Sequence, residues 1–231
     1  MTVDAISASA LTLVRGGRVL CSGCDVSVPV GKCVVIVGPN GSGKTTLLEV
    51  LGGLRDPTAG RVDHLVDPPF GYLPQRPGFR RGFSVAETLR YYRRLTGSRA
   101  GPPVSRLLER VGLSDRAEDP IGGLSGGMTR LFALAVALVG DPAVLLLDEP
   151  MSGLDPRMRD SIIALLAAER DRGRTVIVVT HALEAVDPIA DWGVVMGGGA
   201  KVQAGSVADL MARTASEGLP GAYRGLLEET A

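Results

Sequence analysis

An α/β fold built on a parallel sheet is predicted by three short apolar runs. They are CVVIV, AVLLL and TVIVVT, at 33–37, 143–147 and 175–180, and each is followed by a loop with Gly, Asp or His and then by a helical pattern. Continuous apolar runs of this length are typical of parallel strands buried on both faces. The 231 residues, with 45% hydrophobic and 22% charged content, suit one elaborated globular domain.

The long stretch between the first two strands predicts an inserted group of helices, because one crossover needs far fewer residues. Helices are expected over 84–95, 104–113 and 125–140. The first opens with Ser84 and has Glu87 three residues later, the spacing of a capping box. Another helix follows Asp155-Pro156, and Gly173 is expected to cap its C-terminal end.

Composition excludes several classes of function. The 25 basic and 25 acidic residues give zero net charge, so the chain lacks the electrostatic footprint of a nucleic-acid binder. The longest strongly apolar stretch, 131–140, is too short for a bilayer, which needs about 20 residues. The N-terminus carries Asp4 and no basic region, unlike a signal peptide, and three cysteines do not make a disulfide framework. We therefore expect a cytosolic protein.

A phosphate-binding loop is predicted by GPNGSGKT at 38–45, between the strand CVVIV and a helical pattern. Its glycines let backbone N–H groups turn toward phosphates, Lys44 can reach the β- and γ-phosphates, and the Thr45 hydroxyl can bind Mg²⁺. A glycine-rich turn with a chance lysine is the alternative. The expected nucleotide-binding residues here are Gly38, Pro39, Asn40, Gly41, Ser42, Gly43, Lys44, Thr45 and Thr46.

Two carboxylates end the second strand, in VLLLDE at 144–149. They lie at the carboxyl edge of the sheet, where parallel-sheet ligand sites form. Asp148 suits a Mg²⁺ shell, and Glu149 can face an attacking water as base. Many strands end in a solvated acid, so this motif alone is weak evidence for a catalytic site. It becomes informative because a phosphate-binding loop is predicted upstream.

The motif LSGG at 124–127 begins the third expected helix. Ser125 and the N–H groups of Gly126 and Gly127 form a helix N-terminus, which favours an anion. An ordinary N-cap is the alternative.

In this order the motifs resemble those of the nucleotide-binding subunits of ATP-binding-cassette (ABC) transporters, over about 10–211. The resemblance implies an α/β P-loop NTPase cassette with a RecA-like parallel-sheet core, an N-terminal antiparallel β subdomain and an inserted helical subdomain. We expect a single ABC ATPase domain over 1–231, with its core at 1–75 and 141–231 and its helical subdomain at 76–140.

The resemblance also implies residue roles. Gln75 in GYLPQ would sense Mg²⁺, water and the membrane subunit, and His181 would hold the γ-phosphate as the switch histidine. Asp155 would lie in a loop that crosses to a second subunit. The implied catalytic residues are Lys44, Gln75, Glu149 and His181, and the implied metal-binding residues are Thr45, Gln75 and Asp148.

ATP and Mg²⁺ are the implied cofactors, and two cassettes would dimerise head to tail, so that Ser125, Gly126, Gly127 and Asp155 complete the partner's ATP site. The other implied partner is a polytopic membrane subunit, with the cassette peripheral at the cytoplasmic face of the membrane. LSGGM, GYLPQ and SGLDP resemble exporter ATPases. The rivals are soluble ABC ATPases of DNA repair or translation, and P-loop kinases or GTPases. No sustained heptads occur, only one phosphate loop is present, and a kinase or GTPase would not need LSGG.

Other features leave alternatives open. Arg15 stands where the resemblance leads us to expect an adenine-stacking aromatic, and its guanidinium could stack on a base or stay solvated. The stretch 76–99 has seven arginines and one acid, which fits docking to an acidic loop, binding to anionic lipid or a solvated helix face. The seven are Arg76, Arg80, Arg81, Arg90, Arg93, Arg94 and Arg99.

The cysteines and one histidine are expected to be structural. Cys21, Cys24 and Cys33 are expected to pack in strands rather than bind zinc, since four ligands are lacking. His64 is expected in a surface loop.

Overall fold

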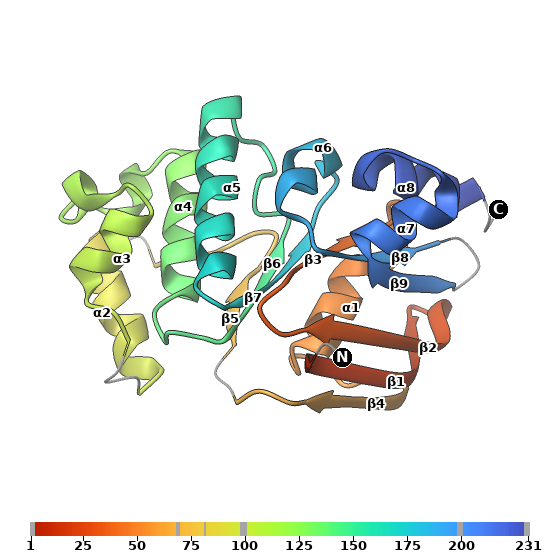
Figure 1. The fold of residues 1–231 in the computed structure, drawn as a ribbon. Coiled ribbons are helices and arrows are strands. Elements are labelled where there is room, and N and C mark those ends of the chain that lie inside the picture. Colours follow the sequence, from red (N-terminus) through yellow and green to blue (C-terminus); the bar gives the residue numbers. More distant parts are fainter. Residues whose placement is uncertain (1–2, 68–69, 81, 98–100, 198–200, 229–231) are drawn as a thin grey trace.

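The computed structural model describes residues 3–67, 70–80, 82–97, 101–197 and 201–228. In this part of the chain a three-stranded antiparallel sheet lies against a six-stranded sheet, whose other face is covered by helices (Figure 1). The predicted fold class, including the antiparallel N-terminal sheet, is confirmed.

The N-terminal sheet has the order β2-β1-β4. Its strands are β1 (Asp4–Arg15), β2 (Arg18–Pro29) and β4 (Ala59–His64). Gly16 and Gly17 make the turn between β1 and β2, with φ of 56° and 76°, as a two-residue hairpin turn requires. The expectation that His64 lies in a loop is wrong, because it pairs with Ile6 at the end of β4.

The six-stranded sheet has the order β5-β6-β7-β3-β8-β9, in which only β9 runs antiparallel to its neighbour. Its strands are β3 (Cys33–Val37), β5 (Gly71–Leu73), β6 (Val144–Asp148), β7 (Thr175–Val179), β8 (Trp192–Met196) and β9 (Val202–Ser206). Every residue of β3, β6 and β7 is buried, as their continuous apolar sequences predict. Parallel pairing brings the carboxyl ends of these three strands to one edge.

The helices follow the strands in chain order. They are α1 (Lys44–Leu51), α2 (Val85–Leu95), α3 (Val104–Arg110), α4 (Gly126–Ala137), α5 (Pro156–Asp171), α6 (Leu183–Val186), α7 (Val207–Thr214) and α8 (Gly218–Glu228). Short 3₁₀ turns are η1 (Ser114–Arg116), η2 (Ile121–Gly123) and η3 (Asp187–Ile189).

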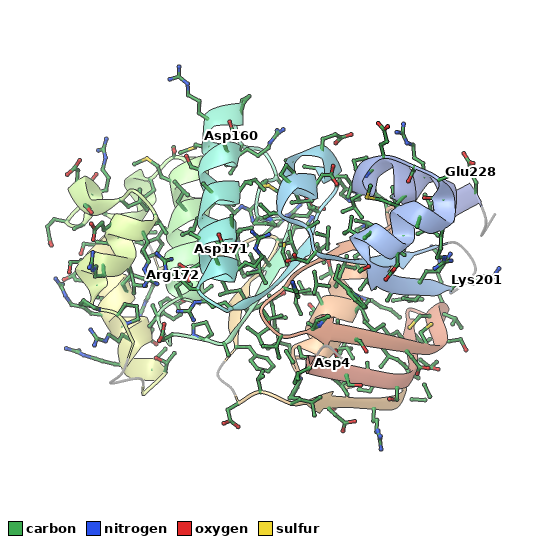
Figure 2. All side chains as sticks on the ribbon, viewed as in Figure 1. Asp4, Asp160, Asp171, Arg172, Lys201 and Glu228 are labelled. Atoms are coloured by element: carbon green, nitrogen blue, oxygen red, sulfur yellow. The ribbon has the colours of Figure 1, made fainter. Side chains whose placement is uncertain are left out.

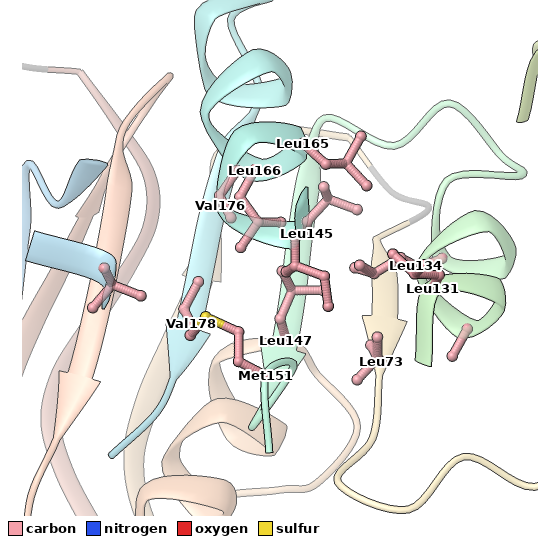
Figure 3. Packing of buried hydrophobic residues seen from close by; sticks show 14 of the residues in the cluster. Leu73, Leu131, Leu134, Leu145, Leu147, Met151, Leu165, Leu166, Val176 and Val178 are labelled. Carbon is pink, nitrogen blue, oxygen red and sulfur yellow. The ribbon is translucent and has the colours of Figure 1, made fainter. Parts of the chain in front are cut away.

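The six-stranded sheet separates two hydrophobic cores, because alternate residues of each strand face opposite sides. Val35 joins the core under the helices, whereas Val34 and Ile36 join the core shared with α1 and the antiparallel sheet. Figure 3 shows the first core, where side chains from β6 and β7 pack against α4 and α5. Charged side chains such as Asp160 and Glu228 lie at the periphery (Figure 2).

The predicted helices are present, with differences at their ends. Ser84 and Glu87 exchange both hydrogen bonds of the capping box before α2. Helix α3 ends at Arg110 rather than at 113, because Gly112 has a left-handed φ of 68°. Helix α4 ends at Ala137 rather than at 140.

A buried ion cluster fastens α3 to the end of α5. Glu169 of α5 is 0% exposed. Its Oε2 accepts a hydrogen bond of 2.7 Å from Arg174 Nε, and its Oε1 lies 3.6 Å from Arg110 Nη1 of α3. Arg172 also donates to Glu169, and Arg174 donates to the carbonyl of Pro142.

The three cysteines are buried as free thiols in β2 and β3, where strand packing was expected. Burial raises the pKa of Cys21 and of Cys33 to about 12. Both groups are therefore neutral thiols at physiological pH.

Candidate functional site

The loop between β3 and α1 approaches neighbouring chain segments so closely that it needs glycine. Gly43 has a φ of 101°, and a Cβ at this position would lie 2.9 Å from the Leu20 side chain of β2. A Cβ on Gly38 would lie 2.6 Å from the carbonyl oxygen of Met196. Glycine is therefore required at both positions of this loop, which precedes the N-terminus of α1, where backbone N–H groups favour phosphate oxygens.

Lys44 is buried at the first position of α1. Its Nζ donates to the carbonyl oxygens of Gly38 at 2.9 Å and Pro39 at 3.1 Å. Burial lowers the pKa of Lys44, while the carboxylates of Glu149 and Asp148 act in the opposite direction. The ammonium group is therefore held inside the loop, where it can contact the phosphates of a bound nucleotide.

Asp148 ends β6 beside the start of α1. Thr45 Oγ1 donates to Asp148 Oδ2 at 2.9 Å, while Asp148 Oδ1 is buried and has no hydrogen-bond partner among the described residues. Burial raises the pKa of Asp148, and the hydrogen bond from Thr45 opposes that rise. A hydroxyl next to a carboxylate oxygen without a protein partner suits Mg²⁺, which prefers oxygen ligands.

Glu149 follows directly and has an unusual backbone. Its φ is 51°, and its N–H donates to the carbonyl oxygen of Val179 in β7 at 2.8 Å. Glu149 Oε1 lies 3.3 Å from Nε2 of the exposed His181. Burial raises the pKa of Glu149, and His181 acts in the opposite direction. A buried carboxyl group with a raised pKa in a cavity is a candidate general base.

These groups surround one cavity of about 260 Å³ at the carboxyl edge of the sheet. The predicted residues that line it are Asn40, Gly41, Gly43, Lys44, Thr45, Thr46, Gln75, Asp148, Glu149 and His181. Arg15 and Leu20, at the tip of the β1–β2 hairpin, line it as well. The phosphate loop, both acids, Gln75 and His181 thus come together within one chain.

The LSGG segment does not join this cavity. Ser125 caps α4 by accepting a hydrogen bond of 3.2 Å from the N–H of Met128, and its side chain is exposed. Gly127 packs against Leu154 and Met158, so a Cβ there would overlap the Met158 sulfur. Asp155 caps α5 by accepting from the N–H of Met158 at 3.0 Å. Two segments expected to act on a partner's site thus lie side by side, away from the cavity of their own chain.

Arg130 was missed by the sequence analysis. Its Nη1 donates to the carbonyl oxygen of Gln75 at 2.9 Å and so ties α4 to the loop that carries Gln75. Burial lowers the pKa of Arg130, while Asp148 and Glu149 act in the opposite direction. A signal was present, because Arg130 is the one charged residue in the α4 sequence GGMTRLFALAVA.

The arginines of the stretch 76–99 have different environments in the structure. Arg90 and Arg94 are exposed on α2, opposite the buried Val85 and Leu89. Arg93 instead donates to the carbonyl oxygen of Gly101 at 3.3 Å. Tyr91 and Leu95 on the same helix are 57% and 62% exposed, which makes this surface both basic and partly apolar. Arg81 and Arg99 lie outside the described residues.

The fold and the cavity define a P-loop nucleotide-binding protein, and comparisons with known proteins identify its family. The ABC transporter family model matches residues 21–152. Nod factor export ATP-binding protein I of Burkholderia orbicola (strain AU 1054) is 37% identical over 204 residues, which are 83% of this chain and 67% of that protein. Nickel import ATP-binding protein NikO of Rhodobacter capsulatus is 38% identical over 218 residues, or 84% and 86% of the two chains. The chain belongs to the ABC transporter family.

Solved structures agree with the fold. An ATP-binding subunit of an ABC transporter superposes with a TM-score of 0.80 at 22% identity, covering 96% of this chain and 99% of that chain. The protein is therefore an ATP-binding cassette of the transporter family. Across the described residues, no helix has both the length and the apolar character needed to cross a membrane.

Proposed function

We propose that this chain is the Mg²⁺-dependent ATPase subunit that powers a membrane transporter, with export as its direction. The observation that carries the proposal is that Lys44 of the phosphate loop and the neighbouring Asp148 and Glu149, about a hundred residues later in the chain, line one cavity. A cationic group, a metal-binding carboxylate and a candidate base are the groups that phosphoryl transfer to water requires.

In this proposal each side chain has a separate task. Lys44 binds the β- and γ-phosphates, and Glu149 orients and polarises the attacking water. His181, whose Nε2 lies 3.3 Å from Glu149 Oε1, holds the γ-phosphate. Thr45, Asp148 and Gln75 would hold Mg²⁺, which would neutralise charge on the phosphate oxygens when bound.

A second cassette completes the site in this proposal. Ser125 and Gly126 present an exposed helix N-terminus, and Asp155 lies in the adjacent loop. Since a helix N-terminus favours an anion, this surface suits the phosphates bound by a partner chain arranged head to tail. The segments 1–75 and 141–231 then act as the nucleotide-binding core, and 76–140 acts as the helical subdomain.

Export through a polytopic membrane subunit is supported by the sequence motifs and by one group of relatives. The Burkholderia protein is named for Nod factor export, whereas the Rhodobacter protein is named for nickel import. LSGGM, GYLPQ and SGLDP in this chain resemble the exporter type. We place the cassette at the cytoplasmic face of the membrane, where ATP is available.

Two substitutions test the ATPase proposal. Glu149→Gln should keep ATP affinity but lower turnover at least 100-fold, because it removes the base and leaves the phosphate contacts. Lys44→Ala should weaken ATP binding itself, because the ammonium contacts the ground-state phosphates. ATP affinity and the rate of phosphate release are measured for both. Wild-type turnover in Glu149→Gln would remove Glu149 from the mechanism, and unchanged ATP affinity in Lys44→Ala would contradict its role.

A further inference from the structure

The two glycines of the LSGG motif have opposite surroundings. A Cβ added to Gly126 would meet nothing within 4 Å beyond its own stretch of helix, whereas a Cβ added to Gly127 would lie 2.1 Å from the sulfur of Met158 and 2.9 Å from its methyl carbon. The Met158 thioether therefore fills the space in front of Gly127 and leaves no room for another heavy atom between them. This contact joins the start of α4 to the start of α5.

Met158 lies where the two segments proposed to face a second cassette meet. Its N–H donates to Asp155 Oδ1 at 3.0 Å, and its side chain packs beside Leu154 against Gly127. Met158 is not among the residues that line the nucleotide cavity. A chemical change at its sulfur should therefore alter how LSGG and the Asp155 loop fit together, without altering the nucleotide contacts of the same chain.

The methionines of the described part of the chain differ in their access to solvent. Exposure decides whether an oxidant reaches a thioether. Met151 and Met196 are only 2% and 0% exposed, whereas Met128, Met158 and Met211 are partly exposed. Met211 lies on α7, while Met128 and Met158 both lie beside LSGG. Within the described ranges, two of the three methionines that solvent reaches are therefore at this motif.

The thiols, which are common targets of peroxides, are insulated in this chain. Peroxides oxidise thiolates, and a neutral thiol reacts slowly. Cys21, Cys24 and Cys33 are buried, and burial raises the pKa of Cys21 and of Cys33 to about 12. Oxidation by peroxide is therefore expected at the exposed thioethers.

We propose that Met158 is a peroxide-sensitive modification site that controls the LSGG surface. This inference rests on the proposed function, because it concerns the surface that would complete a partner's ATP site. The sulfur of Met158 attacks one oxygen of hydrogen peroxide, so that an S–O bond forms and the O–O bond breaks. The other oxygen leaves as water with both protons. Sulfur loses two electrons, and the peroxide gains them.

The sulfoxide does not fit the contact between α4 and α5. Its oxygen has no space on the side of Gly127, and elsewhere it puts a polar acceptor into the apolar contact with Leu154. Both arrangements separate the start of α5 from LSGG. ATPase activity that depends on LSGG should then fall, while ATP affinity, which depends on Lys44 and its loop, should stay unchanged.

Peroxide treatment of matched variants tests the proposal. Wild-type turnover should fall about tenfold as Met158 becomes the sulfoxide, because small displacements at a catalytic site cost this much or more. Met158→Leu, which keeps a similar volume without sulfur, should start within about threefold of wild type and resist peroxide. The controls Met128→Leu and Met211→Leu should be inactivated as wild type is. Peptide mass spectrometry locates the sulfoxides, and methionine sulfoxide reductase should restore wild-type activity.

Met158→Gln tests the consequence without an oxidant, because its amide puts a polar oxygen close to the position of the sulfoxide oxygen. Its turnover should be about tenfold lower than that of wild type. Its ATP affinity, titrated in EDTA to prevent turnover, should stay within about twofold. In a mixture with Lys44→Ala some activity should return, as expected for a defect that acts only on the partner's site.

Several results would overturn the inference. Peroxide could inactivate Met158→Leu as fully as wild type, or wild type could keep full turnover with Met158 mapped as the sulfoxide. Met158 could also stay reduced in treated wild type, or its reduction by the reductase could fail to restore activity. An equal loss of ATP affinity and turnover in Met158→Gln would contradict an effect confined to LSGG. The proposed function fails separately, since untreated wild type would then lack ATPase activity before any oxidation.

Discussion

Glu149 combines two features that burden the folded state. A glutamate with a φ of 51° is in the left-handed region, which side chains other than glycine disfavour. Its carboxyl group is also buried, with an exposed fraction of 8%. Such features persist at sites where the surrounding structure imposes them and where chemistry uses them.

Because Glu149 is buried, replacing its carboxyl group with a neutral amide should stabilise the fold, and the gain should be larger at high pH. The pKa of Glu149 is raised in the folded state. The protonated carboxyl group therefore contributes stability below the ordinary pKa of 4.5, and this contribution is lost as the pH rises through the folded-state pKa. Glu149→Gln should therefore melt at a higher temperature than wild type at pH 8, and the difference should shrink toward pH 5. Thermal unfolding at both pH values checks this. Glu118→Gln, at an exposed position, is the control. An equal melting temperature for Glu149→Gln and wild type at pH 8 would contradict the prediction.

Individual site residues could be predicted from the sequence where they belong to short motifs with a fixed spacing. Gly38 to Thr46 and Asp148-Glu149 sit in short motifs next to apolar strands, and the structure places most of them at one cavity. The contact of Arg130 with Gln75 joins residues 55 positions apart. It depends on how α4 packs, which no local pattern encodes.

Among the elements, α5 and α3 depend on the buried Glu169 cluster. Glu169→Gln would leave the guanidinium groups of Arg174 and Arg110 without their carboxylate. Removing one partner of a buried ion pair costs about 3–5 kcal/mol, so we expect a loss of about that size in the free energy of unfolding. Urea unfolding measures it. Glu109→Gln breaks the exposed pair with Arg106 and should cost less than about 1 kcal/mol. An equal loss in the free energy of unfolding for the two variants would show that the Glu169 cluster does not stabilise the contact between α3 and α5.

The exposed arginines of α2 lead us to predict a charge-dependent contact between this helix and the membrane subunit. Arg90→Gln with Arg94→Gln should leave ATP affinity unchanged, because neither residue lines the cavity, but should reduce co-purification of the membrane subunit. Wild-type recovery should fall as salt rises, since exposed charges are screened over about 8 Å at physiological ionic strength. Arg106→Gln with Arg116→Gln removes the same charge from ion-paired positions elsewhere. Equal recovery of all three proteins at every salt concentration would leave α2 as a solvated face.

Element types were easier to predict than element ends. The three buried strands and the Ser84 cap follow from apolar runs and from one hydrogen-bonding pattern. The early end of α3 at Gly112 and the pairing of His64 with Ile6 depend on backbone conformation and on a distant strand. Apolar periodicity alone does not contain that information.

For the whole molecule, the separation of Ser125 from its own cavity predicts complementation between chains. Mixing Ser125→Arg with Lys44→Ala puts both defects in one composite site and leaves the other site intact. Some ATPase activity should return, although each variant alone has none. Phosphate release by the mixture, by each variant alone and by a mixture with Ser114→Arg in place of Ser125→Arg measures the effect. The mixture with Ser114→Arg gives the activity expected when the LSGG segment is intact. If the mixture with Ser125→Arg is inactive while the mixture with Ser114→Arg is active, the shared site is contradicted.

The hydrogen bond from Arg130 to the carbonyl oxygen of Gln75 joins α4 to the wall of the cavity. The exposed N-terminal end of α4 and the cavity wall are joined by a charged donor, a type of bond worth about 1.5–3 kcal/mol. A push on that end of α4 cannot leave Gln75 in place without breaking the bond. A displacement of α4 would therefore also shift the backbone of Gln75 at the wall of the cavity, and a displacement of Gln75 would shift α4.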